Sequence, residues 1–228
     1  MGQLAHRSPT PSSHSQLRAE PNCRPDTRRG SLPTQKADSP FPGSPQLSWH
    51  IIESLVADEF DVTMCQEMLV DHAFAVPMQL LWRGAGRRPV KTVPIAINTV
   101  QHPLPSATRC FKLGAAVARA VESFEADSRV LIVGTGGLSH QLDGERAGFI
   151  NKQFDLFCME KLVNEPEALL GYSNRELIER AGTQGIEILM WIAARGAMTH
   201  GAQRLHSNYH IPISNTATGV LLLGNPAT

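Results

Sequence analysis

An abrupt change of composition near Leu47 sets how much of this chain can form a folded core. Residues 1–47 hold eight of the 16 prolines in the 228-residue chain, seven serines, and no valine or isoleucine. Such a segment buries too little apolar surface to offset the entropy lost on ordering it. We therefore predict that residues 1–47 are disordered and that residues 48–228 form one domain of ordinary size.

Downstream of this boundary, helix-like and strand-like patterns alternate. Helical spacing of apolar residues predicts helices over residues 49–56, 111–124, 151–163 and 185–197, and a further helix capped by Asn174. Strand-like runs occur at residues 60–64, 93–98, 130–133 and 218–223, the third of them short and apolar enough to be a core strand. This alternation predicts an α/β fold, with a layered sheet flanked by helices.

Composition excludes several classes of function. The formal net charge is zero, which gives no electrostatic argument for a nucleic acid or an anionic membrane as partner. No apolar run approaches the roughly 20 residues of a membrane span. The first residues lack the apolar segment of a secretory signal, although a transit peptide stays an open alternative for them. The four cysteines are widely spaced and fit reduced thiols in a cytoplasmic protein.

Chemistry is expected first where the apolar run Val130–Val133 ends. Glycines follow it at once, and His140 comes within the next seven residues. Ligands collect at such strand ends in α/β sheets, and histidine titrates near neutral pH. A dinucleotide loop is disfavoured because Ser139 replaces the third glycine of GxGxxG, and a nucleophile elbow would need GxSxG. A plain turn with a merely hydrogen-bonded His140 stays open.

Three further places could contribute to the same chemistry. His72 follows Asp71 on a predicted loop, where Asp71 could orient the imidazole or both could face solvent. Glu187 lies within a strongly apolar helix, so its carboxylate must emerge on a narrow polar stripe or be satisfied inside. Ser214 and Asn215 precede a strand and could bind a polar substrate or cap a turn.

Residues 134–155 read GTGGLSHQLDGERAGFINKQFD, and this run resembles the signature of class III extradiol ring-cleaving dioxygenases. Within that family it is most similar to the β (catalytic) subunit of protocatechuate 4,5-dioxygenase and to gallate-cleaving relatives. Further matches occur in the same order: Val70-Asp71-His72 with Val76-Pro77, Pro105-Ser106 with Arg109-Cys110-Phe111, Gly185-Ile186-Glu187 through Met190-Trp191, Arg195-Gly196-Ala197, and Tyr209-His210 through Ser214-Asn215-Thr216-Ala217. The resemblance covers about residues 47–223.

The resemblance implies oxidative opening of a catecholic aromatic acid by O₂ and non-haem Fe(II), with the metal held in a two-histidine, one-carboxylate triad. It assigns the carboxylate ligand to Glu187, the acid/base role to His140 and a second active-site histidine to His72. Ser214 and Asn215 resemble residues that bind the ring substituent. A small α subunit and further copies of the chain are the partners that the family suggests.

The family's two iron-binding histidines belong to a part that precedes the counterpart of Leu47. In this chain Ser12-Ser13-His14 echoes one of them only superficially, because no apolar strand flanks it. We therefore expect a dioxygenase-like domain over 48–228 that is incomplete on its N-terminal side, from a truncated, mis-spliced or frame-shifted gene. Weak iron binding and impaired activity are expected. The alternative is a non-catalytic remnant that serves only subunit interaction, while a metal-dependent hydrolase is disfavoured.

Overall fold

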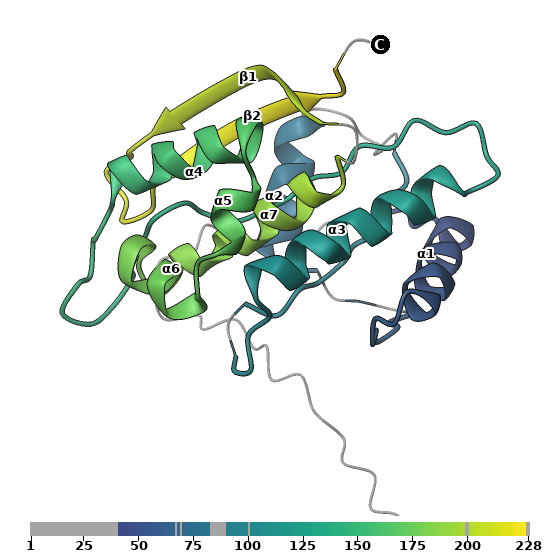
Figure 1. Cartoon of the computed structure of the whole chain (residues 1–228), viewed down its shortest axis with the longest axis horizontal. Coiled ribbons are helices and arrows are strands. Elements are labelled where there is room, and N and C mark those ends of the chain that lie inside the picture. The colour runs from purple at the N-terminus through teal and green to yellow at the C-terminus, as the bar shows by residue number, and fades with distance from the viewer. Residues whose placement is uncertain are drawn as a thin grey trace, which may run out of the picture. The chain divides into compact units, whose positions relative to one another are not determined.

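The computed structural model describes residues 41–66, 68, 70–82, 90–99, 101–198 and 201–226 (Figure 1). In chain order the helices are α1 (Pro45–Ala57), α2 (His72–Leu81), α3 (Ala107–Glu122), α4 (Lys152–Asn164), α5 (Glu167–Leu170), α6 (Asn174–Ala181), the 3-10 turn η1 (Gly185–Glu187) and α7 (Ile188–Gly196). Two strands follow, β1 (Gln203–His210) and β2 (Thr218–Gly224). The predicted mixed α/β class is confirmed.

The strands β1 and β2 form an antiparallel hairpin beside α4 (Figure 1). Gln203 lies opposite Gly224 and His210 opposite Thr218, with an irregularity between Arg204 and His206. The second strand confirms the prediction for residues 218–223. The first was not predicted, because its mostly polar sequence is exposed along nearly its whole length and so lacks an alternating apolar pattern.

The three other predicted strands are wrong. Residues 60–64, 93–98 and 130–133 form no ladder within the described part of the chain. The run Val130–Val133 is exposed rather than buried, and Leu131 has 62% of its surface open to solvent. A strand needs a hydrogen-bonded neighbour as well as an apolar sequence. The described residues bring no such neighbour to this run, so its apolar side chains stay uncovered.

The predicted helices are confirmed, and they carry the core. Helix α1 packs on α3, where Ile51 and Leu55 meet Val117 in a small buried cluster. Helix α3 also crosses α7, and a larger cluster surrounds this crossing. Its fully buried members include Ala107, Cys110, Leu138, Cys158, Leu162, Leu169, Leu177, Leu189 and Ile192. The core therefore lies between helices, and the hairpin covers one side of α4.

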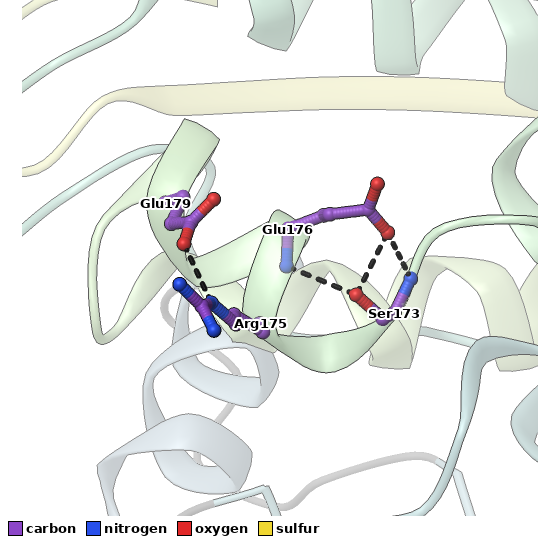
Figure 2. Close-up of polar contacts among 4 residues, drawn as sticks. All are labelled: Ser173, Arg175, Glu176 and Glu179. Atoms are coloured by element: carbon purple, nitrogen blue, oxygen red, sulfur yellow. Dashed lines mark hydrogen bonds and ion pairs between the residues drawn. The ribbon is translucent and has the colours of Figure 1, made fainter.

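Helix α6 begins with a capping box (Figure 2). Ser173 is the cap residue: its Oγ accepts from the Glu176 backbone N–H at 3.2 Å, and the Glu176 carboxylate accepts from Ser173 N at 2.8 Å. The prediction that Asn174 caps this helix is thus off by one residue. The Asn174 amide instead donates to the Pro105 carbonyl at 3.1 Å, tying α6 to the segment before α3.

The first helix begins at Pro45, just before the predicted domain boundary. Ahead of it, Thr92 N donates to Pro42 O at 2.8 Å and Ser44 N donates to Thr92 O at 3.3 Å. Residues 1–40 of the segment predicted to be disordered lie outside the described residues. Within the described part of the chain, none of the helices combines the length and apolarity that crossing a membrane requires.

The crossing of α3 and α7 depends on Gly114. A Cβ added there would lie 1.9 Å from the Ala193 carbonyl oxygen, so Gly114→Ala must push the helices apart. We expect this substitution to lower the free energy of unfolding by roughly 1–3 kcal/mol in urea titrations, although alanine favours helix. Gly171→Ala is the matched control, because a Cβ there meets no atom within 4 Å. Equal stability of the two variants would contradict this account.

Candidate functional site

The glycine loop, residues 134–140, is held in place from several sides. Its Gly136 carbonyl accepts from the Trp191 indole N–H of α7 at 3.0 Å. The Leu138 N–H donates to the carbonyl of Ala217, just before β2, at 3.2 Å. From Leu138 onward the loop is buried. Its conformation is therefore set by tertiary contacts with α7 and with the segment before β2.

His140 ends this loop with a defined ring orientation. The imidazole is buried, and its Nδ1 lies 2.7 Å from the Leu138 carbonyl oxygen. A carbonyl only accepts, so Nδ1 carries the proton and Nε2 is the basic nitrogen of the neutral ring. Among the described residues Nε2 has no hydrogen-bond partner. A Cβ on Gly137 would lie 2.6 Å from the ring carbon Cε1, so this ring position requires glycine there.

Glu187 reaches the same loop from the end of η1. Its Oε2 accepts from the Gly137 N–H at 2.6 Å, and the residue is half-buried. Of the two sequence-based interpretations, internal satisfaction holds, and the partner is a backbone N–H of the loop. Arg195, further along α7, donates instead to the Leu162 carbonyl at 2.7 Å. Glu187 and His140 thus both contact Gly137 and share one short stretch of backbone.

The segment 214–217 runs beside the loop. Thr216 and His140 form an antiparallel bridge. The Asn215 Oδ1 lies 3.5 Å from where a Cβ on Gly148 would be, so this amide faces the predicted signature run. Ser214 is exposed, and no described contact joins it to the loop. The fold therefore places Asn215 beside Gly148, and substrate binding by Asn215 and Ser214 stays a sequence-based prediction.

His72 is not on a loop, as was predicted, but is the first residue of α2. Its neighbour Asp71 caps that helix by accepting from the Ala73 N–H at 3.0 Å, rather than orienting the imidazole. Both His72 and Asp71 are exposed. None of the described contacts joins His72 to the glycine loop, and its role as an active-site histidine stays a sequence-based prediction.

A buried carboxylate that the sequence patterns did not single out lies directly behind the loop. Asp155, in the first turn of α4, is 2% exposed. Its Oδ1 accepts from Ser139 N at 2.8 Å, and its Oδ2 accepts from Ser139 Oγ at 2.6 Å and from the Tyr209 hydroxyl at 2.8 Å. Burial and the contact with Asp155 raise the pKa of the Tyr209 phenol, which stays a donor. The sequence signal that could have indicated burial of Asp155 is its place in the otherwise apolar run Phe154-Asp155-Leu156-Phe157.

The described residues do not by themselves fit a three-ligand metal centre. No group of three or more histidine, cysteine, aspartate or glutamate side chains converges among them. Burial raises the pKa of Cys110 to about 11 and, together with the Asp155 charge, that of Cys158 to about 12. Both stay thiols at neutral pH. Two carboxylates of the described residues reach the glycine loop: Asp155 is buried and accepts from Ser139, whereas Glu187 is half-buried and accepts from Gly137.

Comparison with known proteins places the chain in a defined family. A family model described as the catalytic LigB subunit of aromatic ring-opening dioxygenase matches residues 26–220, beginning inside the segment 1–47. Gallate dioxygenase from Pseudomonas putida is 41% identical over 186 residues, covering 82% of this chain and 54% of that protein. A 2,3-dihydroxyphenylpropionate/2,3-dihydroxicinnamic acid 1,2-dioxygenase from Rhodococcus jostii is 30% identical, covering 75% and 68% respectively. The chain thus spans about half the length of the first relative.

The buried thiols give the stability a defined pH dependence. Below pH 9, Cys158 is neutral in both the folded and the unfolded chain; between pH 9 and about 12 only the unfolded chain releases this proton. Stability is therefore full below pH 9 and falls as pH rises. We expect urea titrations at pH 8–10.5 to show a shallower decline for Cys158→Ala than for the unsubstituted chain. Cys65→Ala, at an exposed thiol, is the control and should leave the decline unchanged.

Proposed function

Because the chain belongs to the family of catalytic LigB subunits of aromatic ring-opening dioxygenases, we propose that it carries the acid/base and substrate-facing part of a ring-cleaving site. The proposed reaction is extradiol cleavage of a catecholic aromatic acid, similar to gallate or protocatechuate, by O₂ in aromatic catabolism. The observation that carries this proposal is His140, buried and oriented with an unengaged Nε2. The free cysteines of the described residues agree with a cytoplasmic location.

His140 is proposed to move the substrate proton. With Nδ1 engaged at Leu138, the Nε2 lone pair is the group that can accept a proton from a phenolic hydroxyl and later return it. Burial around His140 excludes competing water from that exchange. Asn215, whose amide faces Gly148, is proposed to bind the ring substituent. The roles of His72 and Ser214 rest on the family resemblance alone.

We propose Fe(II) as the cofactor, with Glu187 as the ligand that the described residues offer. Its Oε2 is held by the Gly137 N–H, which leaves Oε1 without a hydrogen-bond partner among the described residues. Among the described residues no second or third ligand joins it, and a single carboxylate does not define a coordination geometry. The chain as given is therefore proposed to hold Fe(II) weakly and to be impaired in ring cleavage.

The impairment is tested on the full 228-residue chain. We expect isothermal titration with Fe(II) under anaerobic conditions to show weak binding. An oxygen electrode should then record little uptake with gallate or protocatechuate. Metal content after purification separates this proposal from the alternative, a subunit-interaction domain without catalysis, which would retain no iron at all. Tight iron binding with turnover near that of the Pseudomonas putida enzyme would reject the impairment.

The acid/base assignment is tested in a context where the remaining part of the site is present. Residues 48–223 of this chain replace the matching segment of the Pseudomonas putida gallate dioxygenase, and oxygen uptake is measured with gallate. We expect His140→Gln in this chimera to lower kcat by about 10²–10⁴-fold. His206→Gln makes the same chemical change on exposed β1 and should have no effect. A folded chimera in which both variants keep full kcat would reject the role of His140.

One observation favours the alternative of an interaction domain. The run Val130–Val133 leads directly into the glycine loop, and all four of its side chains are exposed. On the hairpin, Val220 and Leu222 are exposed as well. Uncovered apolar side chains of this kind mark interaction surfaces or aggregation-prone edges. A small α subunit or another copy of the chain is the class of partner proposed for them.

A further inference from the structure

The carboxylate of Asp155 is hydrogen-bonded to Ser139, the residue that precedes His140 in the chain. Asp155 is a buried carboxylate, and no lysine, arginine or histidine of the described residues forms an ion pair with it. Its charge is instead stabilised by three donors, two from Ser139 and one from Tyr209. Burying a carboxylate without a cation costs free energy of folding, so each of these hydrogen bonds is needed to offset the lost hydration of the charge.

Ser139 has each of its polar groups engaged. Its N–H and hydroxyl donate to Asp155, its Oγ accepts from the Asn151 N–H at 2.7 Å, and its carbonyl accepts from the Ala217 N–H at 3.1 Å. A residue held at four points cannot rotate its peptide planes independently of its partners. Ser139 therefore transmits the position of the Asp155 carboxylate to the residues on either side of it.

The link to His140 passes through a single peptide plane. In a trans peptide the carbonyl of one residue and the N–H of the next point in opposite directions within one rigid plane. The Ser139 N–H points at Asp155 Oδ1 at 2.8 Å, which fixes the direction of the Leu138 carbonyl. That carbonyl is the acceptor for His140 Nδ1 at 2.7 Å.

We propose that Asp155 is a positioning residue for His140, which orients the Leu138 carbonyl so that the imidazole holds its proton on Nδ1 and presents Nε2 as the base. The orientation stands on the hydrogen bonds alone, whereas its use in proton transfer rests on the proposed function. Hydrogen-bond acceptors that fix the tautomer of a histidine from the side away from the substrate are common in enzyme sites. Here the partner acts through a peptide plane instead of bonding the ring directly.

The test reads the tautomer and needs no catalysis. ¹⁵N NMR of the full chain with labelled histidine gives the ratio of Nδ1–H to Nε2–H forms for the neutral His140 ring. We expect the Nδ1–H form to predominate in the unsubstituted chain. In Asp155→Asn we expect the ratio to fall about three- to tenfold, the factor that corresponds to weakening one hydrogen bond. Asp155→Ser, which keeps an oxygen acceptor in a smaller side chain, is the second variant and should shift the ratio in the same direction.

Two control variants separate positioning from a general loss of stability. Tyr209→Phe and Ser139→Ala each remove a bond to Asp155 Oδ2 but leave the Ser139 N–H bond to Oδ1. Both should lower Tm and leave the tautomer ratio unchanged, as should Leu169→Ala in the buried core.

Three results would overturn the proposal: an Nε2–H ring in the unsubstituted chain, an unchanged ratio in either folded Asp155 variant, or an equal shift in Leu169→Ala. Because the readout is spectroscopic, each of these results is independent of oxygen uptake. A chimera that fails to cleave gallate would reject the proposed function and leave the positioning of His140 standing.

Discussion

The hydrogen bond from Ser139 N to the buried Asp155 carboxylate is the constraint on which the candidate site depends. It joins the glycine loop to α4, and the hydroxyl of Tyr209 brings β1 to the same carboxylate. A loop, a helix and a strand that are far apart in the chain thus meet at one charged group. Since the Asp155 carboxylate lies in the core, moving any of the three elements would expose its charge or leave it without a hydrogen-bond donor.

Around this constraint the fold brings two polar side chains to one short stretch of backbone. Gly137 is the point where the carboxylate of Glu187 and the ring of His140 come closest to the same residue. The Glu187 carboxylate accepts from the Gly137 N–H, and the His140 ring occupies the space that a side chain on residue 137 would fill. The glycines of the signature therefore serve packing around the side chains of Glu187 and His140, which explains why they occur without a nucleotide-binding pattern.

Sequence patterns predicted the helices well and the sheet poorly, for a physical reason. A helix satisfies its own backbone, so the spacing of apolar residues in 111–124 and 151–163 was enough to locate α3 and α4. A strand depends on a neighbour that may be distant in the chain. The apolar run 130–133 has the composition of a core strand, yet among the described residues it has no neighbour and remains exposed.

The sequence by itself determined the family, the helices other than α2 and α5, and the residue types available for chemistry, because these depend on local order and on a collinear set of motifs. Only the tertiary structure decided which residues meet. It brought Glu187 to the loop of His140, put Asn215 beside Gly148 and His72 at a helix start, and revealed Asp155 behind the loop. Asp155 lies 16 residues from its donor Ser139 and 54 residues from its donor Tyr209 in the chain, and no periodic pattern encodes such distances.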